Sequence, residues 1–210
     1  MTSSKRESLS LLIETMKLAA GALKRADVPV LLAGGLAAWA RGGPPTDHDV
    51  DFYIYERDGE RALAALAKAG MRVEKPSSGW LFKAYDGDVL VDLIYRPAGS
   101  PVDDAMFARA DKLEVMSEPL LVASLDDVLA TKLSAITEQE PDFSAVLSLA
   151  RSLREQINWR DVYARTSDSP FARAFFVLAE GLGILEGGIA RLNGSGEPAE
   201  RHRAASRIAR

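Results

Sequence analysis

An apolar run that stops at a Gly-Gly pair, shortly before two closely spaced aspartates, is the feature that most constrains this chain. The run Val28–Ala33 predicts a short buried strand, and Gly34 and Gly35 end it. Glycines at this point let the backbone turn sharply and let a bulky anion approach the main-chain amides, because no Cβ stands in the way. A helix is predicted over Leu36–Arg41, before a Gly-Gly-Pro-Pro breaker. Gly34 and Gly35 are therefore candidate anion-binding residues.

The aspartates open a second predicted strand, Asp49–Tyr55. Side chains at i and i+2 of a strand project together, so the carboxylates of Asp49 and Asp51 should lie side by side. Such carboxylates repel each other unless a cation neutralises them, and hard oxygen ligands suit Mg²⁺ or Mn²⁺. Asp47 offers the same spacing relative to Asp49 and is the fallback ligand. The alternative is an acidic loop entering a strand with its carboxylates in water.

The segment that carries these features, LLAGGLAAWARGGPPTDHDVDFYI, resembles the signature of the nucleotidyltransferase fold shared with DNA polymerase beta. In that family an apolar strand, Gly-Gly or Gly-Ser, a short helix and an Asp-x-Asp strand follow one another. The resemblance implies an α/β (α+β) fold, with a mixed sheet followed by a helical C-terminal domain. We expect a catalytic domain over 1–123, a helical domain over 124–192 and a disordered tail over 193–210.

Further elements follow from periodicity and turn residues. Helical spacing of apolar residues predicts helices over Ser8–Arg25 and Asp58–Gly70. Strands are predicted at Met71–Glu74, Trp80–Tyr85 and Asp88–Tyr95, with Asp86-Gly87 as the hairpin turn between the last two. Residues 97–123 are expected to be connective, with a short helical segment and at most an edge strand.

Asp92 interrupts the otherwise apolar run Val89–Tyr95. A buried carboxylate is costly unless it is paired or bound to metal, so Asp92 is either functional or faces outward from a half-exposed strand. In the family that the chain resembles, a third metal-binding carboxylate comes from a strand beside the Asp-x-Asp strand. The resemblance thus implies that Asp49, Asp51 and Asp92 hold the metal.

Two residues of the C-terminal half are candidates through the resemblance. Ser124 followed by two acids predicts the start of a helix that carries Lys132. The segment ASLDDVLATKL resembles one whose lysine contacts the nucleotide phosphates, although a lone lysine on a helix is commonly a solvated residue. Asp142 resembles an acidic nucleotide-site residue of antiphage and toxin members. The basic residues that usually precede that acid are missing here.

Composition excludes several classes of function. The 210 residues are 47% hydrophobic, with no cysteine, two histidines and a net charge of −4. Disulfides and thiolate metal sites are excluded, a zinc site is disfavoured, and indiscriminate nucleic-acid binding is not expected. No apolar run is long enough to span a membrane and the N-terminus has no cleavable signal pattern, so we expect a cytoplasmic protein.

The resemblance is strongest to AbiEii-type and MenT-type toxins, which implies NMP transfer from an NTP to the 3′ end of tRNA and a cognate antitoxin. Thr46, before the aspartate strand, is the candidate for modification by that antitoxin; ordinary turn chemistry is the alternative. Other possibilities are an aminoglycoside-type or lincosamide-type antibiotic nucleotidyltransferase and a catalytically silent binding module. Five arginines of the C-terminal half would contact RNA, unless they are salt-bridged surface residues: Arg151, Arg154, Arg160, Arg165 and Arg173.

Overall fold

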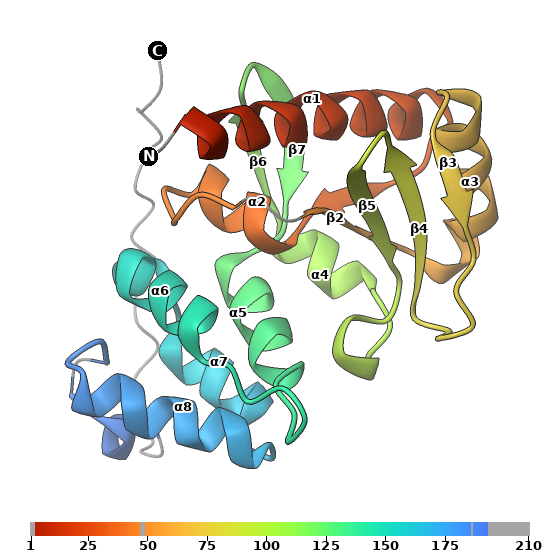
Figure 1. Cartoon of the computed structure of the whole chain (residues 1–210). Coiled ribbons are helices and arrows are strands. Elements are labelled where there is room, and N and C mark those ends of the chain that lie inside the picture. The colour runs from red at the N-terminus through yellow and green to blue at the C-terminus, as the bar shows by residue number, and fades with distance from the viewer. Residues whose placement is uncertain (1–2, 47–48, 186, 193–210) are drawn as a thin grey trace.

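A seven-stranded mixed sheet forms the centre of the N-terminal half, with helices on both sides (Figure 1). The computed structural model describes residues 3–46, 49–185 and 187–192. The strand order is β3-β4-β5-β2-β1-β7-β6, with β2–β5 and β1–β7 parallel and the other pairs antiparallel. The expected fold class, a mixed sheet followed by helices, is confirmed.

Short strands and helices are interspersed through residue 122, and helices follow. The strands are β1 Val30–Leu32, β2 Asp49–Ile54, β3 Arg72–Glu74, β4 Leu81–Asp86, β5 Val89–Ile94, β6 Asp111–Val115 and β7 Glu118–Val122. The helices are α1 Ser3–Arg25, α2 Gly34–Ala40, α3 Gly59–Lys68, α4 Asp104–Arg109, α5 Leu125–Ser134, α6 Ser144–Leu153, α7 Trp159–Thr166 and α8 Pro170–Gly181. Short 3₁₀ turns include Pro97–Gly99.

Alternation along β2 separates its two faces. Val50 and Phe52 point away from the aspartates and are fully buried. Helix α1 contacts β2, β5 and α3 and runs along one side of the sheet, whereas α5 lies on the other side (Figure 1). The aspartate face is directed toward α5, because Tyr53, which shares that face, is hydrogen-bonded to Thr131 of α5. The site face therefore lies between the sheet and the C-terminal helices.

Helix α5 is the centre of the helical half and contacts α2, α6, α7 and α8. The Ser124 hydroxyl accepts the backbone N–H of Asp127 at 3.1 Å, which is the expected N-cap. Most of the apolar side chains of α5, such as Val128, Leu129 and Leu133, are fully buried. Among the described residues, no helix is long and apolar enough to cross a membrane.

The expectation for residues 97–123 was wrong in one respect. Strand β7 is not connective or an edge, because it pairs in parallel with β1 and lies inside the sheet, with Leu32 opposite Val122. The main-chain N–H of Ala123 also donates to the carbonyl of Leu32 at 2.9 Å. Strand β6 takes the edge position. The predicted tail over 193–210 lies outside the described residues.

Candidate metal centre

Three aspartates from two parallel strands converge on the site face. Strands β2 and β5 are in a register that places Asp51 opposite Asp92, and Asp49 lies two residues before Asp51 on the same strand. One carboxylate oxygen from each of the three residues lies within 4.8 Å of the others. Asp92 is buried, with 7% of its surface exposed, and the other two are half-buried. The structure thus brings together the three carboxylates that the sequence analysis predicted as metal ligands.

The cluster carries electrostatic strain in the absence of a cation. Burial, with further contributions from Asp49 and Asp92, raises the pKa of Asp51 to about 7, although the nearby charges of Lys132 and Lys83 act in the opposite direction. Burial also raises the pKa of Asp92, against a hydrogen bond from Lys83. Like charges in a partly desolvated place disfavour ionisation. A divalent cation among these oxygens would relieve that strain.

The donor set fits a hard divalent cation. Carboxylate oxygens are the ligands that Mg²⁺ and Mn²⁺ prefer, and Mg²⁺ usually takes one or two protein carboxylates beside water and phosphate oxygens. Asp49, Asp51 and Asp92 are the residues that would hold it. Asp49 and Asp51 are half-buried, so these two ligands keep some contact with solvent.

Gly34 allows this cluster to lie directly against the start of α2. Its φ of +55° is in the left-handed region, and a Cβ there would stand 1.6 Å from Oδ2 of Asp51. A Cβ at Gly35 would stand 2.6 Å from the hydroxyl oxygen of Thr46. Both glycines are thus required by the close approach of neighbouring side chains, a reason that the sequence analysis did not give. Their role toward a bound phosphate stays a prediction.

We expect Gly34→Ala to displace the Asp51 carboxylate and to reduce Mn²⁺ affinity at least about tenfold, since ligand geometry fixes metal binding. The unfavourable φ alone costs about 1 to 2 kcal/mol of stability. Gly87→Ala is the matched control, because Gly87 has a φ of +58° with no atom within 4 Å of the added Cβ. Calorimetric titration with Mn²⁺ and thermal unfolding separate the two effects. Equal Mn²⁺ affinity in both variants would contradict the close-approach argument.

Lys132 lies on the helix that faces the cluster. It is half-buried in the last turn of α5, and its positive charge lowers the pKa of Asp51. The preceding residue, Thr131, shares a 2.9 Å hydrogen bond with the hydroxyl of Tyr53. Because Thr131 can donate to the Asp127 carbonyl at 2.8 Å, Tyr53 serves as the donor to Thr131. This contact ties Lys132 to the strand that carries Asp51.

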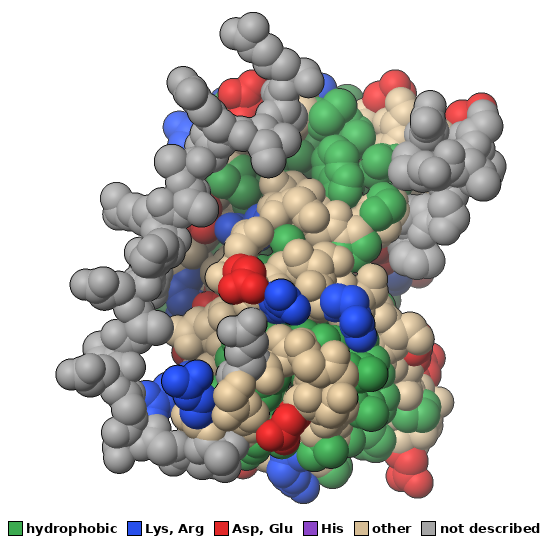
Figure 2. Space-filling model, turned by 90° about the vertical axis from the view of Figure 1, so that its left-hand side faces the viewer, with side chains coloured by type: hydrophobic (Ala, Val, Ile, Leu, Met, Phe, Trp, Pro, Cys, Tyr) green, Lys and Arg blue, Asp and Glu red, His purple; other side chains and the backbone are tan. Residues whose placement is uncertain are grey.

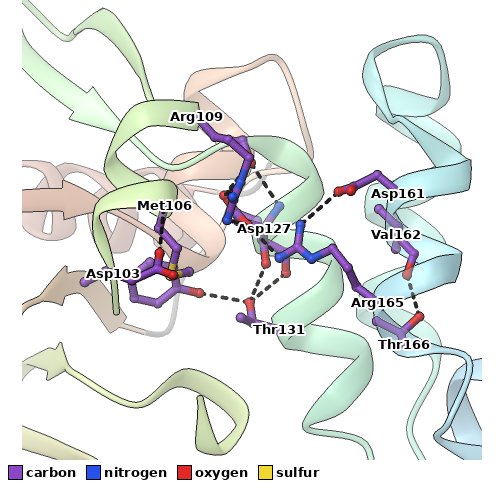
Figure 3. A network of polar contacts seen from close by, with 12 residues as sticks. Asp103, Met106, Arg109, Asp127, Thr131, Asp161, Val162, Arg165 and Thr166 are labelled. Atoms are coloured by element: carbon purple, nitrogen blue, oxygen red, sulfur yellow. Dashed lines mark hydrogen bonds and ion pairs between the residues drawn. The ribbon is translucent and has the colours of Figure 1, made fainter. Parts of the chain in front are cut away.

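Asp127 is the centre of a polar network that joins α4, α5 and α7 (Figure 3). Its fully buried carboxylate accepts from Arg109 at 2.9 and 3.1 Å, from Arg165 at 2.6 Å and from the Ser124 hydroxyl at 2.7 Å. Burial raises the pKa of Asp127, but these hydrogen bonds outweigh it and hold the pKa below its usual value. The network fixes α5, and with it Lys132, against the sheet domain.

Asp142 is placed differently from the other candidates. It is exposed, and its carboxylate accepts the backbone N–H of Ser144, the first residue of α6, at 2.8 Å. Hydrogen bonding from the Ser144 side chain and from this backbone N–H lowers the pKa of Asp142. This local contact is what the structure shows for Asp142, and its nucleotide role stays a prediction. The fallback ligand Asp47 lies outside the described residues.

Sequence reasoning missed Lys83. This lysine lies on β4 directly opposite Asp92, with 3.2 Å between Nζ and Oδ1. The signal that could have found it is the hairpin turn, because the position of a tight turn fixes the register of its two strands. Gly87 and Asp88 form the loop, so that Asp86 pairs with Val89 and Lys83 with Asp92.

Comparison with solved structures agrees with this architecture. No family model matches the chain, and no curated protein matches it. The crystal structure of ANT(2″)-Ia in complex with adenylyl-2″-tobramycin has a TM-score of 0.58 and 17% identity to this chain, covering 78% of this chain and 98% of that one. The solution structure of the antibiotic-resistance factor ANT(2″)-Ia has a TM-score of 0.58 and 16% identity, covering 83% and 97%. At these identities the similarity shows a shared fold.

Proposed function

We propose that this protein is a Mg²⁺-dependent nucleotidyltransferase that moves an NMP group from an NTP to a hydroxyl acceptor and releases pyrophosphate. The single observation that carries the proposal is the convergence of Asp49, Asp51 and Asp92 beside Gly34. A silent binding module of the same fold would have no need for three mutually repelling carboxylates, which lower stability when no cation is bound.

The residues divide the work of the reaction. The acceptor oxygen forms a bond to the α-phosphorus, the bond from that phosphorus to the pyrophosphate oxygen breaks, and the hydroxyl proton passes to a carboxylate of the cluster. A bound Mg²⁺ supplies Lewis acidity and neutralises phosphate charge. Asp49, Asp51 and Asp92 would hold the cation. Lys132, on the helix that faces these carboxylates, is suited to the triphosphate as a point charge.

Lys132→Ala tests the triphosphate contact. Loss of one charge-assisted hydrogen bond costs roughly 1.5 to 3 kcal/mol, so we expect kcat/KM for the NTP to fall about tenfold to a hundredfold. Lys112→Ala, which removes an exposed lysine of β6, is the control and should keep wild-type kinetics. Steady-state kinetics with varied NTP measure both. Unchanged kinetics in Lys132→Ala would mean that Lys132 is a solvated surface residue with no contact to the triphosphate.

Two acceptor classes are compatible with the site. The sequence resemblance to AbiEii-type and MenT-type toxins supports the 3′ end of tRNA, with a cognate antitoxin as partner. The fold similarity to ANT(2″)-Ia, which spans nearly all of that protein, supports a small hydroxylated acceptor. A cavity of about 240 Å³ lies between the 97–101 segment, α4 and α5, and Thr131, next to Lys132, contributes to its wall.

Three of the five candidate arginines of the helical half are held by partners within the protein, which favours the small acceptor. Arg165 is tied to Asp127 and Asp161, Arg154 to Glu155, and Arg173 to two main-chain carbonyls. Among the described side chains visible on the face drawn in Figure 2, basic ones are interspersed with acidic and apolar ones and form no continuous basic surface. We therefore place a small hydroxylated molecule first and the tRNA end second.

The antitoxin proposal depends on the second acceptor class. Thr46 packs against Gly35 beside the cluster, so a phosphate there would add roughly −1.5 to −2 charges near the metal ligands. A phosphate on Thr46 would occupy space beside the metal ligands and add negative charge there. Both effects would oppose binding of Mg²⁺–NTP. The role of Thr46 rests on the resemblance alone.

One experiment tests the function and separates the acceptors. Purified protein is incubated with Mg²⁺, each α-labelled NTP, and either total tRNA or a panel of aminoglycosides and lincosamides. Labelled product on a small molecule, absent in Asp51→Asn, is the expected result. Label on tRNA 3′ ends, weakening steeply with salt, would instead support the toxin assignment. Release of no pyrophosphate with any NTP would falsify the proposed function.

A further inference from the structure

Lys83 is a fourth charged residue on the face that carries the aspartate cluster. The register of the sheet puts Lys83 of β4 opposite Asp92 of β5, and Asp92 opposite Asp51 of β2. Residues directly opposite one another on neighbouring strands project from the same face. The three side chains therefore form a row across the sheet, with Lys83 at one end and Asp51 at the other.

Lys83 is held close to the cluster. Its Nζ lies 3.2 Å from Oδ1 of Asp92, and 26% of its side chain is exposed, against 10% for Asp92. The lysine thus contacts Oδ1 of Asp92, a residue that also contributes a carboxylate oxygen to the cluster, in which one oxygen of each aspartate lies within 4.8 Å of the others.

An ammonium group at this position has two physical consequences. It fixes the direction of the Asp92 carboxylate, because one oxygen is held by a charge-assisted contact. It also repels any divalent cation that binds to the same carboxylates. A free metal ion consequently binds more weakly than three aspartates alone would allow, whereas a metal ion that already carries a triphosphate brings compensating negative charge.

We propose that Lys83 is a positioning residue that orients Asp92 and lowers the affinity of the nucleotide-free site for divalent cations, so that the metal enters together with the NTP. This inference rests on the proposed function, since it assigns a role to Lys83 within the same site. A purely structural ion pair between β4 and β5 makes a different prediction for metal binding. Removing such a pair would loosen the strands and leave metal affinity unchanged or weakened, and would not strengthen it.

The test is to measure Mn²⁺ binding without nucleotide, using the electron paramagnetic resonance signal of free Mn²⁺ as the readout. A unit charge and a double charge about 5 Å apart interact appreciably even in water, so Lys83→Met should bind Mn²⁺ at least about fivefold more tightly than wild type. Lys83→Arg keeps the charge and should retain wild-type affinity. Lys75→Met is the matched control, because Lys75 pairs with Glu60 at the exposed surface. A second neutral variant, Lys83→Gln, replaces Lys83→Met if thermal unfolding shows that Lys83→Met is not folded.

Transfer assays give the second readout. Lys83→Met should show reduced kcat at saturating Mn²⁺ despite its tighter binding, because Asp92 is no longer oriented. Unchanged or weaker Mn²⁺ affinity in both neutral variants overturns the role of Lys83, while the metal site stands if Asp51→Asn loses Mn²⁺. If wild type and Asp51→Asn bind Mn²⁺ equally poorly, the metal centre of the proposed function fails, and this inference fails with it.

Discussion

Asp51→Asn should abolish NMP transfer, with kcat/KM expected to fall at least about a thousandfold, since metal binding contributes several kcal/mol to stabilising the charge of phosphoryl transfer. Asp51 lies between the other two carboxylates on the shared face, opposite Asp92 in register and two residues from Asp49. The amide keeps the shape of the side chain but removes the negative charge. The measurement is pyrophosphate release with Mg²⁺ and the productive NTP.

The same change should leave the metal-free protein at least as stable as wild type. The pKa of Asp51 is raised to about 7. A carboxyl group whose pKa is raised on folding binds more protons in the folded state, so wild type loses stability as the pH rises from about 4 to about 7. Asp51→Asn lacks this loss, and its melting temperature without metal should exceed that of wild type at pH 8. Added Mg²⁺ should raise the melting temperature of wild type only.

Asp88→Asn is the control for this prediction. Asp88 is an exposed carboxylate in the loop of the hairpin that contains Asp92, so its change removes one charge without touching the cluster. It should keep transfer activity and the response to Mg²⁺. Wild-type activity in Asp51→Asn would remove this residue from the metal centre. A fall in metal-free stability at pH 8 would contradict the strain of the cluster.

Two local patterns in the sequence identify the three aspartates as candidates. Asp49 and Asp51 share a face through the two-residue period of a strand, and Asp92 is conspicuous inside an apolar run. What the patterns do not contain is the pairing of the two strands. That the two strands lie side by side came to the prediction from the family resemblance, and the parallel register that places Asp51 opposite Asp92 is a finding of the structure.

Lys83 was missed because a small error in the predicted position of a hairpin turn changes which residues pair across the two strands. A loop made of Asp86 and Gly87 would pair Lys83 with Leu90, two residues from Asp92 along β5. In the structure the loop is Gly87 and Asp88, and this later turn pairs Lys83 with Asp92 instead of Leu90. Gly87 alone has a positive φ in this loop, which suits a turn that needs glycine only at its first central position.

Local sequence patterns could not predict the position of β7 in the sheet or the partners of the arginines. Strand β7 contains only a few apolar residues, and its place beside β1 depends on contacts between segments far apart in the chain. Arg109 and Arg165 lie on two helices that do not adjoin in sequence, yet both reach the carboxylate of Asp127. Charge on a helix is commonly solvated, so periodicity gives no sign of such a buried partner.

Asp127→Ala should be the most destabilising single substitution in the polar network, by about 2 to 4 kcal/mol, because it leaves buried donors without an acceptor. The carboxylate of Asp127 is 1% exposed, whereas the side chains of Arg109 and Arg165 are 35% and 31% exposed. The arginines can therefore turn partly to water, which keeps the loss below that of a fully buried pair. At about 2 to 4 °C per kcal/mol, the melting temperature should fall by roughly 5 to 15 °C.

Acid unfolding gives an independent check on this prediction, because the pKa of Asp127 is held below its usual value in the folded state. A carboxylate with a lowered pKa adds stability above its unfolded pKa of about 4, and that stability is lost as the pH falls through the folded pKa. The difference between wild type and Asp127→Ala should therefore narrow below about pH 4. Asp161→Ala is the matched control: it removes only the exposed partner of Arg165 and should cost less than about 1 kcal/mol. If Asp127→Ala were as mild as Asp161→Ala, the network would not hold α5 against α4 and α7, and Lys132 would depend on the Tyr53–Thr131 contact for its position.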